Sequence, residues 1–146
     1  MSEGDLRLEL SEDDLHDELL SIEDRLYEFN VEATGIRDGR LLRVVLRDGA
    51  GRLVAAAMGH TWGGTCEIVQ LWVEAARRRG GLGRKLMARA EAEARARGCR
   101  QIVLTTHSFQ APDFYRRLGF VPLGEIPDYP AGHSKITLRK PLGDGG

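Results

Sequence analysis

A short segment rich in glycine and arginine, residues 77–83, places the tightest constraint on how this chain can fold. It follows an apolar run that ends at Val73 and is typical of a buried strand, and it leads into a helical pattern that begins at Leu82. Glycines let the backbone curl so that several N–H groups point into one concavity, and the start of a helix adds the positive end of its dipole. The segment is therefore suited to bind a pyrophosphate.

Two common nucleotide-binding motifs do not fit this segment. A Walker P-loop requires Ser or Thr after Gly-Lys, whereas here Gly83 is followed by Arg-Lys-Leu. A dinucleotide-binding fingerprint requires a third glycine three residues after Gly83, where Leu86 stands. The pattern that fits is R-x-x-G-x-G, formed by Arg78, Gly81 and Gly83.

The remaining periodicities predict one α/β or α+β domain over residues 1–146, built on a single sheet with helices on its faces. Ser11 is the expected N-cap of a first amphipathic helix that runs past Phe29, and Gly98 is the expected cap of a second helix that begins at Leu82. A short third helix is expected at 111–118, and the tail 142–146 is expected to fray. Strands are expected at 6–10, 41–47, 53–62, 66–73, 101–106, 120–126 and 135–138.

Composition narrows the classes of function. No apolar run approaches the ~20 residues that a membrane span needs, and the chain opens on a polar, acidic stretch, so a cytoplasmic protein that does not enter membranes is expected. Cys66 and Cys99 form no CxxC pair, which argues against a disulfide framework or a zinc site. The isoelectric point of about 6.4 and the absence of aromatic residues among the arginines argue against nucleic-acid binding.

A second motif lies downstream, where residues 111–120 read A-x-x-x-Y-x-x-x-G-F with Tyr115 at its centre. Together the two motifs resemble the GNAT family of N-acetyltransferases, and the similarity covers residues 62–138. The resemblance implies a mixed, mostly antiparallel sheet of six to seven strands with helices on both faces. It also implies acetyl-CoA as cosubstrate with no metal, and homodimer formation as a family habit.

The resemblance assigns coenzyme A contacts to the central strand, the glycine–arginine segment and the second motif. On the strand, main-chain groups would bind the pantetheine arm and the thioester carbonyl. The family often has Asn seven residues before the tyrosine, where this chain has Ser108, whose hydroxyl has a shorter reach. The expected binding residues are Leu71, Trp72, Val73, Arg78, Arg79, Gly80, Gly81, Leu82, Gly83, Arg84, Ser108, Ala111 and Tyr115.

Acetyl transfer to an amine requires an acid for the leaving thiolate and a base for the amine. By the resemblance, Tyr115 is the acid, since a phenol with a pKa of about 10 is protonated at neutral pH; the alternative is an aromatic side chain that only packs the third helix. Glu67 is the first choice of base, and strand alternation places it on the face of Val69 and Leu71. The alternative for Glu67 is a solvent-facing or salt-bridged residue, and three histidines are rival bases, namely His60, His107 and His133.

The acceptor is inferred from charge alone. Residues 1–34 carry 12 Asp and Glu against 2 Lys and Arg, which favours a cationic small-molecule amine. A protein lysine or amino terminus is an alternative acceptor, and a non-catalytic acyl-CoA-binding module is an alternative function. Four further residues are candidates for the acceptor site: Trp62, Trp72, Asp128 and Tyr129.

Overall fold

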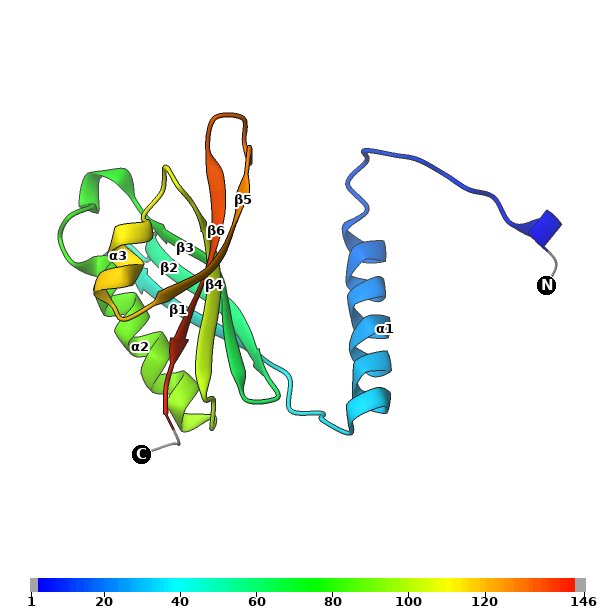
Figure 1. Ribbon diagram of the computed structural model, residues 1–146, viewed down its shortest axis with the longest axis horizontal. Coiled ribbons are helices and arrows are strands. Elements are labelled where there is room, and N and C mark those ends of the chain that lie inside the picture. The colour runs from blue at the N-terminus through cyan, green and yellow to red at the C-terminus, as the bar shows by residue number, and fades with distance from the viewer. Residues whose placement is uncertain (1–2, 144–146) are drawn as a thin grey trace. The chain divides into compact units, whose positions relative to one another are not determined.

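The computed structural model describes residues 3–143, which divide after Ile36 into a small N-terminal unit and a larger unit. The N-terminal unit holds a short 3-10 helix, η1 (Glu3–Asp5), and the helix α1 (His16–Thr34) (Figure 1). Gly35 ends α1 in the left-handed region at φ 74°, and its N–H donates to the carbonyl of Val31.

The predicted strand at 6–10 is wrong. These residues form no regular structure, and Leu8 and Leu10 are fully exposed. Alternation of leucine with polar residues stabilises a strand only where a neighbouring strand pairs its backbone, and the described part of the N-terminal unit contains no other strand. The Ser11 cap is also wrong: its hydroxyl accepts a hydrogen bond from the Asp13 N–H in a local turn, and the helix begins at His16.

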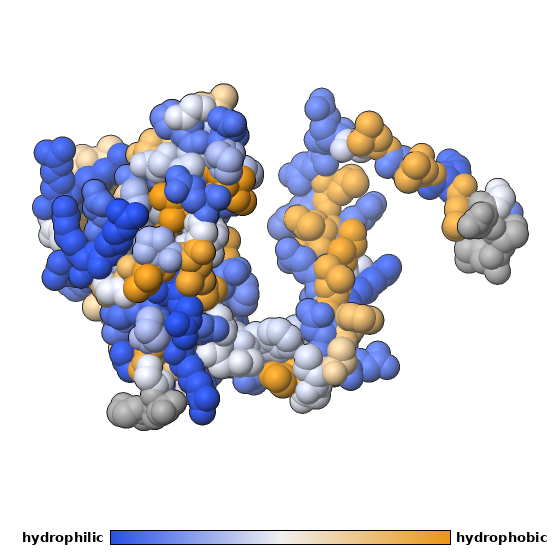
Figure 2. Space-filling model, in the orientation of Figure 1, coloured by the Kyte–Doolittle hydropathy of each residue, from blue (hydrophilic) through white to orange (hydrophobic). Residues whose placement is uncertain are grey.

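The amphipathic helix itself is confirmed, with its start moved towards the C-terminus. Five apolar positions at helical spacing are 49% to 67% exposed, and Figure 2 shows apolar side chains gathered along the helix. The positions are Leu15, Leu19, Ile22, Leu26 and Phe29. Among the described residues 3–143, no helix is both long enough and apolar enough to span a bilayer.

The larger unit is built on one six-stranded mixed sheet with the order β1-β2-β3-β4-β6-β5 (Figure 1). Only the central pair, β3 and β4, is parallel; the other neighbours are antiparallel. This confirms the expected mixed, mostly antiparallel sheet. The strands are β1 (Arg40–Arg47), β2 (Leu53–Trp62), β3 (Thr65–Val73), β4 (Gln101–His107), β5 (Val121–Pro127) and β6 (Ser134–Pro141).

The core lies between the sheet and two helices, α2 (Leu82–Ala96) and α3 (Pro112–Arg117). Helix α2 begins after η2 (Ala75–Arg77) and the glycine–arginine segment, and it buries Leu86, Met87, Ala90 and Ala94. Gly98 follows α2 with φ 80°, as a C-terminal glycine should. The buried residues that fill this core include Leu42, Cys66, Ile68, Leu86, Met87, Ala90, Ile102, Leu104 and Leu138.

The C-terminal segment is better anchored than expected. Leu142 is 4% exposed, its N–H donates to the Arg100 carbonyl, and its own carbonyl accepts from the Arg95 guanidinium at 2.6 Å. Fraying at Leu142 is therefore contradicted. Residues 144–146 of the expected frayed tail lie outside the described residues.

A β-bulge in β3 shapes the centre of the sheet. Met58 pairs with Gln70 and Gly59 with Ile68, so Val69 is an extra residue with no partner on β2. Gly59 lies so close to β3 that a Cβ there would meet the Glu67 carbonyl oxygen at 1.8 Å. The bulge therefore depends on a residue without a side chain at position 59.

We expect Gly59→Ala to lower the free energy of unfolding by about 1–3 kcal/mol, because the methyl group must displace the backbone of β3. Urea unfolding followed by circular dichroism measures this change. Gly49→Ala is the matched control, since a Cβ at that position has no neighbour within 4 Å. Equal stability of the two variants would contradict the close approach.

Candidate active site

A cleft passes through the sheet where β3 and β4 part. Their pairing runs from Thr65 and Gln101 to Ile68 and Leu104; in the described chain both strands then continue without pairing each other. The cleft has a volume of about 1210 Å³ and takes residues from both faces of β3. Its wall comprises Leu53, Ala56, Met58, Val69, Gln70, Leu71, Trp72, Val73, Arg77, Arg78, Arg79, Gly81, Leu82, Gly83, Arg84, Thr105, Thr106, His107, Phe109, Gln110, Ala111, Phe114, Tyr115 and Lys135.

The glycine–arginine segment forms one end of this cleft. Arg79 and Gly81 have φ values of 68° and 83°, so the backbone curls in the left-handed region before α2 begins. The first helical hydrogen bond joins the Lys85 N–H to the Gly81 carbonyl at 3.1 Å. The preceding amides of the first turn have no carbonyl four residues back within the helix, which makes this end of the cleft attractive to anions.

Ion pairs of Glu74 anchor the start of the glycine–arginine segment. Glu74 accepts from Arg52 at 2.6 Å and from Arg77 at 3.2 Å, and the hydrogen bond from Arg52 is the main reason that the pKa of Glu74 lies below its usual value. Arg78 donates from Nε to the Val73 carbonyl at 3.0 Å. The only described carboxylate in this loop is thus engaged with two arginines, and the cleft end stays positively charged.

Gly83 lets α2 approach α3. A Cβ at Gly83 would lie 3.3 Å from Cζ of Phe114, whose ring lines the cleft. The second glycine of the R-x-x-G-x-G pattern therefore has a packing role. The absence of a side chain at Gly83 lets the first turn of α2 lie close to the helix that carries Tyr115.

Tyr115 is buried at the cleft wall, with 7% of its surface exposed. Its ring meets those of Phe114 and Phe120 edge to face, with centroids 5.1 Å and 5.7 Å away. Burial raises the pKa of the phenol to about 12. The side chain therefore packs in the core and is also a protonated phenol at neutral pH. Packing of the third helix and a role as an acid are thus compatible for Tyr115.

His107 lies at the carboxyl end of β4, in a turn closed by Gln110. The Gln110 amide oxygen accepts from the His107 N–H at 2.7 Å, and the His107 carbonyl accepts from the Gln110 N–H at 2.9 Å. The ring nitrogen Nδ1 lies 3.0 Å from the Tyr129 carbonyl oxygen. Because a carbonyl oxygen only accepts, Nδ1 carries the proton in this contact, and Nε2 of a neutral ring keeps its lone pair.

Glu67 lies outside the cleft wall, half exposed beside His60, with Oε2 3.9 Å from Nε2. The expectation that it shares a face with Leu71 is wrong. Leu71 packs against the same core as Ile68, because the extra residue Val69 reverses the alternation between them.

Ser108 points its hydroxyl oxygen at the backbone of β6. Ser108 Oγ accepts from the Ser134 N–H at 3.0 Å, and the Ser108 N–H donates to the Ser134 carbonyl at 2.9 Å. The side chain therefore joins the turn after β4 to β6 and does not line the cleft. The Ser108 hydroxyl therefore stabilises the turn after β4 and is not directed at the proposed pantetheine site.

The structure brings most of the expected residues together. Those that line the cleft are Leu71, Trp72, Val73, Arg78, Arg79, Gly81, Leu82, Gly83, Arg84, His107, Ala111 and Tyr115, whereas Gly80, Glu67 and Ser108 do not. Sequence reasoning missed the wall residues contributed by β2, the bulge, the turn after β4 and β6, chiefly Met58, Val69, Gln70, Phe109 and Lys135. The pairing of His107 with Lys135 depends on strand order, which no local pattern encodes.

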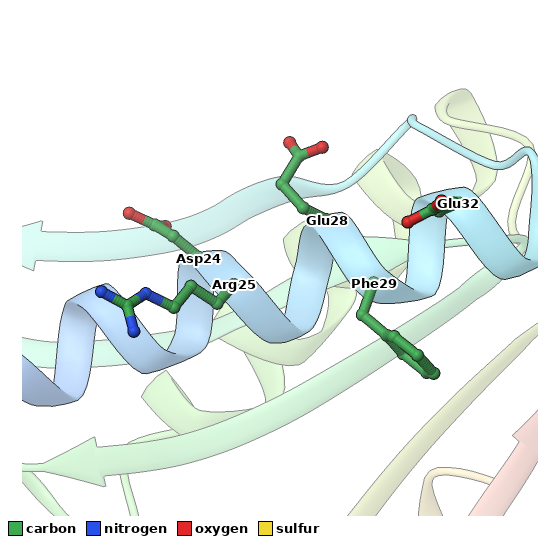
Figure 3. Close-up of a pocket in the computed structure, with 5 residues that line it drawn as sticks. All are labelled: Asp24, Arg25, Glu28, Phe29 and Glu32. Carbon is green, nitrogen blue, oxygen red and sulfur yellow. The ribbon is translucent and has the colours of Figure 1, made fainter. Parts of the chain in front are cut away.

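The four residues considered for the acceptor site do not all lie at the cleft. Trp72 lines the cleft, Tyr129 packs against His107, and Trp62 and Asp128 are not part of the wall. A smaller hollow of about 370 Å³ lies along α1, where Figure 3 shows the carboxylates of Asp24 and Glu28 directed away from the Phe29 ring. Within residues 3–143, no group of three or more His, Cys, Asp or Glu side chains is arranged to hold a metal ion.

Comparison with known proteins agrees with this geometry. Residues 6–120 match the model of the acetyltransferase (GNAT) family. The chain is 43% identical over 93 residues to blasticidin-S acetyltransferase of Streptomyces morookaense, covering 63% of this chain and 68% of the relative. It is 33% identical over 120 residues to an acetyltransferase of Agrobacterium fabrum, covering 82% and 88%. A crystal structure of a candidate acetyltransferase from Agrobacterium tumefaciens superposes with a TM-score of 0.85 at 31% identity, covering 94% and 100%.

The raised pKa of Tyr115 predicts a pH-dependent loss of stability. Between pH 10 and 12 the unfolded chain gives up the phenolic proton before the folded chain does, so the free energy of unfolding falls as pH rises. We expect the stability difference between wild type and Tyr115→Phe to change by about 1 kcal/mol in favour of the variant between pH 9 and pH 11. Urea unfolding at the two pH values measures it, and a constant difference would contradict the buried phenol.

Proposed function

Because the chain belongs to the acetyltransferase (GNAT) family, we propose that it moves the acetyl group of acetyl-CoA to the amine of a small molecule by direct attack in a ternary complex. The observation that carries the proposal is the cleft through the sheet. It joins an anion-binding turn at the start of α2 to a protonated phenol and a histidine with a free ring nitrogen. An acetyl-cysteine intermediate is disfavoured, because Cys66 and Cys99 are buried and burial raises the pKa of both thiols.

The charge of the cleft wall suits the anionic coenzyme A. Amides of the α2 start and the side chains of Arg78, Arg79 and Arg84 would bind the pyrophosphate, and the unpaired edge of β3 beyond Ile68 offers main-chain groups to the pantetheine arm. When bound, acetyl-CoA supplies the acetyl group as a thioester. Gly81 and Gly83 keep side chains out of the phosphate end.

Two side chains of the cleft would serve as the acid and the base of the reaction. Tyr115 holds its proton well beyond neutral pH, which suits a donor to the leaving sulfur. His107 Nε2 would accept the proton of the attacking amine, while the Tyr129 carbonyl fixes the ring through Nδ1. We place His107 ahead of Glu67 as the base because His107 lines the cleft and Glu67 does not.

A small-molecule acceptor is supported by the relative named for blasticidin S, a small molecule. The cationic character expected from the acidic N-terminal residues finds no support in the cleft, where the described wall contains Arg and Lys but no Asp or Glu. The family match over residues 6–120 spans both compact units and supports one catalytic domain. A cytoplasmic location is favoured by the two free cysteines, Cys66 and Cys99. A homodimer stays a proposal, which light scattering can test.

We expect Arg78→Ala to weaken coenzyme A binding roughly tenfold, because it removes a charge from the phosphate end and the side chain that ties the turn to Val73. Isothermal titration calorimetry measures the dissociation constant at low and moderate salt. Arg100→Ala is the matched control, since Arg100 precedes β4 at its opposite end and is exposed. Identical binding by both variants would argue against the proposed phosphate site.

We expect Tyr115→Phe to lower kcat roughly 100-fold with little change in coenzyme A affinity, because the variant keeps the ring and loses the proton. A thiol-release assay with acetyl-CoA and a panel of primary amines measures it. Tyr27→Phe, the same change in α1, is the control. A kcat within twofold of wild type would exclude Tyr115 as the acid, and coenzyme A binding without turnover of any amine would favour a binding module over an enzyme.

A further inference from the structure

Aromatic rings cluster at the end of the cleft formed by β4 and β6. The His107 ring stacks with Phe109 and with Tyr129, in both cases with centroids 5.3 Å apart, at interplanar angles of 10° and 29°. His133 meets Phe109 edge to face at 5.0 Å. The Lys135 ammonium lies 5.0 Å from the centre of the Tyr129 ring. The cluster therefore contains more aromatic surface than the proton transfer assigned to His107 requires.

Hydrogen bonds anchor the turn that carries part of this aromatic cluster. Gln110 closes the turn that carries Phe109, and Thr106 donates to the same Gln110 oxygen at 3.2 Å. The Ser108 N–H and hydroxyl oxygen both bond to the backbone of Ser134 and so join this turn to β6. A side chain on such a turn loses little conformational freedom when it binds a ligand, so its contact contributes more to affinity.

Phe109 and His107 are the rings of this cluster that line the cleft. Phe109 keeps 55% of its surface exposed although it contacts both His107 and His133. The same wall includes Met58 from β2 and Trp72 from β3, which contribute further polarizable surface, and Trp72 is 45% exposed. An exposed aromatic ring in a wall of this composition is suited to contact with a flat ring of a ligand.

We propose that the acceptor is an amine carrying an aromatic or heteroaromatic ring, and that Phe109 selects it by stacking while the amine lies at His107. This inference rests on the proposed function, because it names the class of substrate for the same cleft. The charge of the wall is consistent with it: recognition by a π-face needs no carboxylate, and the described wall has none.

Two amines that differ only in the ring test the proposal. 2-Phenylethylamine and 2-cyclohexylethylamine have the same chain and the same charge, so a difference in binding reports the flat aromatic ring. Calorimetry on the protein saturated with coenzyme A gives dissociation constants without turnover. We expect the phenyl compound to bind wild type roughly five- to tenfold more tightly than the cyclohexyl compound.

Variants connect the preference to one side chain. Phe109→Ala should abolish the preference while Phe109→Trp keeps it, and Phe29→Ala, which removes an exposed ring from α1, should leave it intact. Melting temperature and coenzyme A affinity confirm that the variants are folded.

Equal dissociation constants for the two amines, no measurable binding of either, or a preference that persists in Phe109→Ala would overturn the stacking proposal. The acetyl-transfer assay is read separately. Ring preference in binding without transfer to any amine would overturn the proposed function and support the aromatic site, whereas transfer without ring preference would do the reverse.

Discussion

The close approach of Gly59 to the Glu67 carbonyl is the constraint on which the site depends. It lets β3 carry one residue more than β2, and beyond this bulge β3 no longer pairs with β4. A sheet that had stayed paired to Val73 would have satisfied its own backbone groups and left no opening. The parting of two strands thus provides both a passage through the sheet and a strand edge able to bind an extended ligand.

The two ends of the opening are made rigid in different ways. At the start of α2, Glu74 accepts hydrogen bonds from Arg52 and Arg77, which fixes the turn, while Arg78, Arg79 and Arg84 keep that end of the wall positively charged. At the other end, Gln110 and Ser108 fasten the turn after β4 by neutral hydrogen bonds. Positive charge therefore gathers at the start of α2, whereas the surroundings of His107 are aromatic rings and carbonyl groups.

The sequence predicted the strand–turn–helix around the glycines and the tyrosine motif because these depend on local backbone geometry. It could not predict the bulge at Val69, since nothing in a run of apolar residues marks which one is unpaired; the misplacement of Glu67 follows from that single residue. Residues 6–10 had the alternation of a strand, but a strand needs a partner. Phe109 and Lys135 lie far apart in sequence and share the cleft only through the pairing of β4 with β6.

Long-range charge and short-range contact select different properties of an acceptor. Charge acts on any cation within about 10 Å at ordinary salt and does not distinguish one amine from another. An aromatic ring in the wall of the proposed acceptor site would act only on molecules that fit against it. The 12 acidic residues among positions 1–34, which the sequence displays, therefore do not identify a substrate, whereas the side chains that would do so are brought together only by the folded sheet.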